Sequence, residues 1–94
     1  MSITVEALKQ LNLVEFLLKH YGLKCQQVGS GYVTHSPFSA DRQASFTLRE
    51  HGGRWLFKDF SSGLGGSIID LVGAMEGLSD IGRIIERVRE MVGR

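Results

Sequence analysis

Cysteine and proline are almost absent from this 94-residue chain, which contains one of each. Because Cys25 has no second cysteine to pair with, no intrachain disulfide can form, and the stapled folds of small secreted proteins are excluded. Long hydrophobic runs are also missing: no stretch approaches the ~20 apolar residues of a membrane span. The N-terminal segment is amphipathic and does not resemble a secretory signal. Together these absences predict a cytoplasmic protein.

A charge of one sign is lacking too. Eleven Lys and Arg face ten Asp and Glu, so the formal net charge is +1. A dedicated nucleic-acid-binding protein is usually more basic. Charge therefore predicts nucleic-acid contact that is weak or assisted by a partner, or none. The length predicts a single small domain over residues 1–94.

Helices are expected at both ends of the chain. Residues 3–10 form a short, ambiguous helical segment. Asn12 is placed as an N-cap, and Gly22 as the glycine that ends the same helix in a left-handed turn. A further helix is expected from Ser67 to Gly77, and Ser79 is the expected N-cap of the last one.

Strands are expected in the middle. A Gly-Ser-Gly turn separates two extended segments, 23–28 and 31–35. "SFTLRE" and "RWLFKDF" alternate apolar and polar residues around "HGG" and predict an antiparallel hairpin, whose apolar positions continue through Trp55, Phe57 and Phe60. "SSGLGG" is expected to be a loop, and no Gly-Lys-Ser/Thr follows it as in a P-loop. The order predicts an α+β fold, with a small antiparallel sheet flanked by an N-terminal helix and two C-terminal helices.

Two stretches combine into one pattern: "SPFSADRQASF" at 36–46 and "WLFKDFSSGLGGSIIDLV" at 55–72. They resemble the zinc-binding domain of bacterial DNA primases, which carries C-P-F-H-x-E-K-T-P-S-F followed by C-F-x-C-x-x-G-G. The resemblance extends over about residues 12–90. The matching residues are Pro37, Phe38, Asp41, Arg42, Ser45, Phe46, Phe60, Gly63, Gly65 and Gly66.

The four zinc-ligand positions of that family fall on Ser36, Ser39, Asp59 and Ser62. Structural zinc requires thiolates and imidazoles, and three hydroxyls with one carboxylate bind it too weakly to support folding. The resemblance therefore implies a zinc-ribbon-like but metal-free member, with no cofactor.

Other residues do not supply a metal site. Cys25, His35 and His51 show no ligand spacing such as C-x₂-C or H-x₃-H, and they are expected to be ordinary surface or strand residues. The serines are expected to form side-chain-to-backbone turns. Asp59 is expected to accept N–H groups from the 39–43 loop or to pair with Arg42, so that hydrogen bonds link the two loops.

The resemblance implies a DNA-binding module that contacts single-stranded template and assists a separate catalytic domain in primer synthesis. Trp55 and Phe57 share one strand face and are expected in the core, and the cations opposite them are expected to contact DNA. The proposed nucleic-acid-binding residues are Arg42, Arg49, Arg54, Lys58 and Lys24.

A second hypothesis is an interaction module that docks on a replication partner, such as a primase-like catalytic protein or a helicase, without touching nucleic acid. An enzyme is the least favoured hypothesis, because Asp59, Asp70 and Glu76 are isolated and no serine has an evident His base. The chain is expected to be either a fragment of a primase-like protein or a small separate protein of a mobile element.

Overall fold

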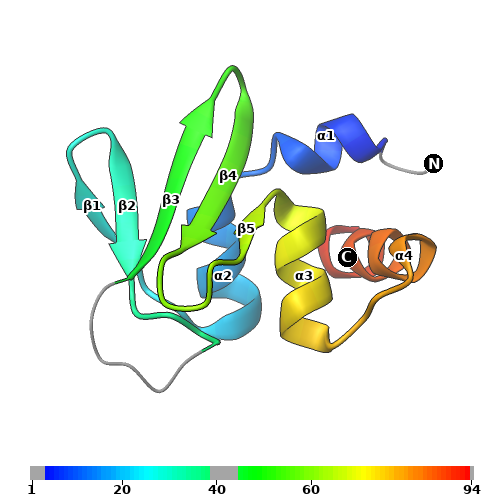
Figure 1. The fold of residues 1–94 in the computed structure, drawn as a ribbon. Coiled ribbons are helices and arrows are strands. Elements are labelled where there is room, and N and C mark those ends of the chain that lie inside the picture. Colours follow the sequence, from blue (N-terminus) through cyan, green and yellow to red (C-terminus); the bar gives the residue numbers. More distant parts are fainter. Residues whose placement is uncertain (1–3, 39–44, 94) are drawn as a thin grey trace.

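The computed structural model describes residues 4–38 and 45–93 and contains helices at both ends of the chain and a sheet between them (Figure 1). In chain order, its elements are α1 (Val5–Lys9), α2 (Leu13–Tyr21), β1 (Gln26–Val28), β2 (Gly31–Thr34), β3 (Phe46–His51), β4 (Arg54–Asp59), β5 (Gly65–Gly66), α3 (Ile68–Glu76) and α4 (Ile81–Val92).

The strands form one sheet in the order β1-β2-β3-β4-β5, and every neighbouring pair is antiparallel. The longest ladder joins β3 and β4, from Phe46 opposite Asp59 to His51 opposite Arg54. The predicted α+β class is therefore confirmed. The prediction that the whole glycine-rich stretch is loop was wrong at its end, because Gly65 and Gly66 pair with Lys58 and Phe57.

The helices gather on one side of the molecule. Figure 1 shows α2 crossing behind the sheet and α3 and α4 lying beyond β5, while the β1–β2 hairpin projects away from them. The exposure of β4 alternates strictly along the strand: Trp55, Phe57 and Asp59 are buried, whereas Leu56 and Lys58 are exposed. This is the pattern of a sheet with one covered and one open face, and the expected burial of Trp55 and Phe57 is confirmed.

Aromatic rings and leucines fill the space between the sheet and the helices. Phe46 and Phe57 stack with their ring centroids 5.3 Å apart, and Phe38 lies against both rings at 6.1 and 6.5 Å. Fully buried leucines from the helices complete this core, among them Leu8, Leu13, Leu17 and Leu71. The core packs around the start of β3 and the end of β4, where the two loops of the sequence pattern meet.

Most of the predicted helix ends are confirmed. The Asn12 side chain accepts from the backbone N–H groups of Val14 and Glu15, and Gly22 ends α2 with a φ of 67°. Gly77 ends α3 in the same left-handed conformation. The N-cap of α4 is Asp80 and not Ser79, because the Asp80 carboxylate accepts from the N–H of Gly82 at 2.9 Å.

The start of α3 is closed by a capping box. The Ser67 hydroxyl accepts from the N–H of Ile69, and the Asp70 carboxylate accepts from the N–H of Ser67 at 2.9 Å. Gly66 has a φ of 138°, and a Cβ there would overlap the Asp70 carboxylate. Glycine at this position therefore lets β5 run directly into the capped helix.

Across the described ranges, none of the helices combines the length and the apolar character that crossing a bilayer requires.

Candidate functional site

Asp59, at the end of β4, is the centre of a hydrogen-bond cluster that joins the two loops. Its side chain is fully buried. The Ser36 hydroxyl donates to Oδ2 of Asp59 at 2.8 Å, and the Ser62 hydroxyl donates to the same oxygen at 2.6 Å. The Ser61 hydroxyl donates to Oδ1 at 2.9 Å, and that of Ser45 reaches the same oxygen at 3.4 Å. The side chains at three family ligand positions, 36, 59 and 62, therefore meet; Ser39, the fourth, lies outside the described residues.

Two of these serines also hold their own loops. The Ser36 hydroxyl accepts from the N–H of Phe38 at 3.1 Å, and the Ser62 hydroxyl accepts from the N–H of Leu64 at 3.2 Å. Each hydroxyl thus accepts from a loop amide and donates to the carboxylate. The expected serine turns are confirmed at Ser36 and Ser62, whereas the Ser61 hydroxyl binds Asp59 and Ser39 lies outside the described residues. The expected donors to Asp59, the 39–43 loop and Arg42, lie outside the described residues. The described donors are serine hydroxyls and the Ser61 amide.

The cluster stabilises Asp59 in its ionised form. Burial acts to raise the pKa of the carboxyl, but hydrogen bonds from Ser62, Ser36 and Ser61 lower it by more, so this pKa lies below its ordinary value of 3.8. The native environment therefore favours the carboxylate more than water does. Charge-assisted hydrogen bonds of this kind are among the stronger ones in proteins.

This lowered pKa predicts a specific loss of stability in acid. A group whose pKa is lower in the folded state stabilises the fold above its unfolded pKa, and that contribution disappears as the pH falls through the folded value. We expect the free energy of unfolding of the natural chain to exceed that of D59N at neutral pH, and this difference to shrink below about pH 4. Urea titrations of both proteins from pH 7 to pH 2 measure it. If the difference does not change with pH, the pKa of Asp59 is not lowered in the folded state.

The donor atoms of the cluster do not fit zinc. Serine hydroxyls are not the thiolate or imidazole ligands of structural zinc sites. Among residues 4–38 and 45–93, no three His, Cys, Asp or Glu side chains are grouped so that they could hold a metal ion. Cys25 is half-buried, and burial raises the pKa of its thiol, which favours the protonated form.

The open face of the sheet carries cations. Arg49 on β3 lies opposite Leu56 on β4, and Thr47 lies opposite Lys58. These four residues line a shallow hollow of about 350 Å³ together with Phe57 and Phe60. The Lys58 ammonium donates to the carbonyl of Gly63 at 3.1 Å, and within the described ranges no carboxylate pairs with Arg49. The structure therefore brings together two of the five proposed nucleic-acid-binding residues.

The other three proposed residues are placed differently. Arg54, near the turn of the β3–β4 hairpin, is held by Glu6 in a two-pronged ion pair, with both N···O distances 2.7 Å. Lys24 precedes β1 and is exposed, and its carbonyl accepts from the Thr34 hydroxyl. Arg42 lies outside the described residues. The ion pair of Arg54 was not anticipated, because nothing in the sequence places α1 beside the hairpin.

Phe60 is a candidate site residue that the sequence analysis did not single out. It was treated as a continuation of the apolar face of Trp55 and Phe57, yet its side chain is 68% exposed and lines the hollow. The sequence contained the information that was needed. Side chains of an extended chain alternate between the two faces, so Phe60 is expected on the same open face as Leu56 and Lys58.

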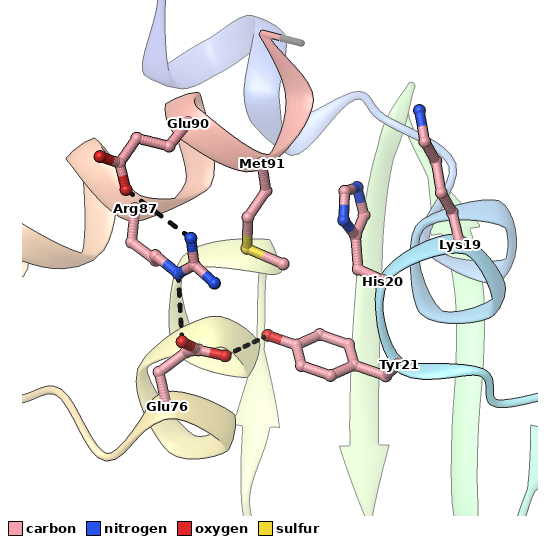
Figure 2. Close-up of a pocket in the computed structure, with 7 residues that line it drawn as sticks. All are labelled: Lys19, His20, Tyr21, Glu76, Arg87, Glu90 and Met91. Carbon is pink, nitrogen blue, oxygen red and sulfur yellow. Dashed lines mark hydrogen bonds and ion pairs between the residues drawn. The ribbon is translucent and has the colours of Figure 1, made fainter.

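A second hollow, of about 560 Å³, lies between α2, α3 and α4 (Figure 2). The Tyr21 hydroxyl donates to Glu76 at 3.1 Å, and Arg87 donates to the other Glu76 oxygen at the same distance. Arg87 also pairs with Glu90 at 3.7 Å. Burial, and then the charge and hydrogen bond of Glu76, raise the pKa of Tyr21, so its hydroxyl remains a donor.

The charges in this second hollow balance one another. Burial, followed by the neighbouring charges of Lys19 and Arg87, lowers the pKa of His20, which is therefore neutral at pH 7. Two cations, Lys19 and Arg87, then face the two carboxylates of Glu76 and Glu90. The network joins three helices and shows no preference for an anionic ligand, unlike the hollow on the sheet.

A protein-family model described as the CHC2 zinc finger, the zinc ribbon of the primase DnaG, matches residues 1–92. No curated protein matches the chain.

Proposed function

We propose that this chain, which belongs to the CHC2 zinc-finger family of primases, binds single-stranded DNA through the open face of its sheet. The observation that carries the proposal is the hollow on β3 and β4, where cations and an exposed aromatic ring lie together. Family membership supports a primase-related DNA-binding module. The hollow supports the open face of the sheet as the binding surface and single-stranded DNA as the ligand.

The charge of the chain is unevenly distributed in a way that favours this face. The net charge is only +1, yet the outward positions of β3 and β4 carry cations and no acidic residue. These positions are Thr47, Arg49, His51, Arg54, Leu56 and Lys58. A local cation cluster attracts the phosphate backbone even when the whole protein is nearly neutral.

The hydrogen-bond cluster at Asp59 holds the backbone that carries this face. Lys58 and Phe60 flank Asp59 directly, and the N–H of Phe60 donates to the Ser45 carbonyl at 2.9 Å. Hydrogen bonds from the serines hold Asp59 itself. In our proposal this cluster does without zinc what zinc does in the family: it fixes the loop and strand end that present the binding residues.

We expect the proposed cations to contribute unequally to binding. Arg49 and Lys58 are the central phosphate contacts, and Lys24 and Arg42 are proposed as further phosphate contacts. Arg54 contributes less, because contact with a phosphate requires it to leave Glu6. The module acts with a separate primase-like catalytic domain in primer synthesis, and we infer that it has no catalytic activity and no cofactor of its own.

The test is binding of a short fluorescein-labelled oligothymidylate, followed by anisotropy at several salt concentrations. Each lost phosphate contact on a single strand should reduce the slope of log K against log salt by about 0.7, so R49A/K58A should bind about tenfold more weakly in low salt with a slope smaller by about 1.4. The charge-matched control K19A/R83A removes two cations from α2 and α4 and should bind like the natural chain.

If the natural chain does not bind the oligonucleotide even in low salt, the proposal fails, and docking on a replication protein becomes the better hypothesis. If the control pair weakens binding as much as R49A/K58A does, nucleic acid binds by net charge and not through this face.

A further inference from the structure

We infer that Phe60 is the stacking platform for an unpaired base in the hollow on β3 and β4. This inference rests on the proposed function and adds to it the class of contact and the residue that makes it. It is carried by the exposure of Phe60, by the rigidity of its backbone and by the residues that surround the ring.

Nothing in residues 4–38 and 45–93 explains the exposure of Phe60. Its side chain is 68% exposed, although burial of a phenylalanine stabilises a protein by about 1.5–3 kcal/mol. The aromatic residues of β3 and β4, Phe46, Trp55 and Phe57, are all buried. An exposed ring beside two cations matches the composition of single-strand binding surfaces, where aromatic faces bind bases and cations bind phosphates.

The backbone beneath the ring is held on both sides. The N–H of Phe60 donates to the carbonyl of Ser45 at 2.9 Å, and the preceding residue is the fully buried Asp59. The Asp59 carbonyl accepts from the N–H of Gly63 at 2.8 Å, which closes the following turn. The backbone that carries the ring is therefore already ordered, so little further ordering is needed when a base binds.

The ring and the cations alternate on the open face. Lys58 on β4 lies two residues before Phe60, which directly follows the strand, and Leu56, 39% exposed, lies two residues before Lys58. Arg49 stands opposite Leu56 on the neighbouring strand. A base on Phe60 would therefore have a cation beside it for its phosphate, and the next base would reach the apolar surface of Leu56.

Stacking of this kind requires a base that is free of its own neighbours. Bases in a duplex are already stacked and present their edges only, whereas single strands can turn their faces to aromatic side chains. We therefore expect the hollow to select single-stranded nucleic acid, and we expect the selection to depend on Phe60 more than on the cations.

The experiment compares oligothymidylate binding by the natural chain, F60A, F60L and I81A, with the same anisotropy assay and an unlabelled duplex as competitor. F60A should bind about tenfold more weakly with an unchanged salt slope, because stacking releases no counterions. F60L keeps apolar area without a ring and should also bind more weakly. I81A removes an equally exposed apolar side chain, 66% exposed, at the start of α4 and should bind normally.

F60W provides a direct readout of stacking. An indole at this position should restore the affinity, and its emission should be quenched on binding, while the buried Trp55 serves as a constant background in the natural chain. Circular dichroism establishes that each variant is folded.

The outcomes separate the stacking inference from the proposed function. If F60A and the natural chain bind equally and with the same salt slope, the stacking inference is wrong and the proposed function stands. If F60L binds as tightly as the natural chain, apolar contact and not stacking explains Phe60. If the natural chain binds no single strand in low salt, both claims fail.

Discussion

Replacing Asp59 with alanine is expected to lower the free energy of unfolding by about 3 kcal/mol and the midpoint of thermal unfolding by about 15 °C. The reason is the position of this carboxylate, which is fully buried and accepts hydrogen bonds from four serines on two loops. Removing it leaves the buried Ser36 hydroxyl without its acceptor, and an unsatisfied buried polar group costs about 1–3 kcal/mol.

The sign of this effect follows from the pKa of Asp59. Burying a carboxylate can cost more than its partners return, in which case an apolar replacement is neutral or stabilising. Here the hydrogen bonds lower the pKa in spite of burial, so the fold favours the charged carboxyl over its protonated form more than water does. The alanine variant therefore loses a favourable interaction.

Urea and thermal unfolding of D59A, D59N and D80A measure this effect. D59N retains one acceptor oxygen and should fall between D59A and the natural chain. D80A removes an exposed helix cap and should cost only about 1 kcal/mol. A D59A variant within 0.5 kcal/mol of the natural chain would show that the cluster does not hold the loops.

Restoring thiolates at the four ligand positions should convert the chain into a zinc protein. In S36C/S39C/D59C/S62C, the described positions 36, 59 and 62 already converge, since the Ser36 and Ser62 hydroxyls both reach Oδ2 of Asp59. Four thiolates form a closed structural site, and zinc bound to such sites contributes about 10–16 kcal/mol of apparent binding free energy at pH 7. We expect one zinc per chain and thermal unfolding that becomes strongly sensitive to a chelator.

The control is the variant with three cysteines that keeps Ser62. It lacks one ligand of the tetrahedron and should bind zinc more weakly. If the four-cysteine variant takes up no zinc, or if its stability does not respond to zinc, positions 36–62 do not preserve the geometry of the family site.

Local signals in the sequence predict much of this fold. Asn12, Gly22 and Gly77 determine helix ends through their own side-chain or backbone chemistry, which requires no knowledge of distant residues. The Trp55 and Phe57 alternation predicts the buried face of β4 for the same reason. The N-cap of α4 was displaced by one residue because Ser79 and Asp80 are both competent caps, and the choice depends on how α3 ends.

The candidate site depends on contacts that the local sequence does not encode. The family pattern placed Ser36 and Asp59 near each other, but the four-serine arrangement requires the β3–β4 register that brings Ser45 beside Phe60. The Glu6–Arg54 ion pair joins residues 48 positions apart. Phe60 was misjudged because its apolar character was given more weight than its strand parity.

We propose that hydrogen bonds to Asp59 take the place of the zinc of the family in this chain. The most direct measurement is elemental analysis of the natural chain, purified with zinc present, together with its thermal unfolding in the presence and absence of a chelator. We expect less than one zinc per ten chains and the same cooperative transition in both conditions, beside the zinc-dependent four-cysteine variant as reference. One zinc per chain, or unfolding brought about by the chelator, would show that zinc and not the Asp59 cluster joins the two loops.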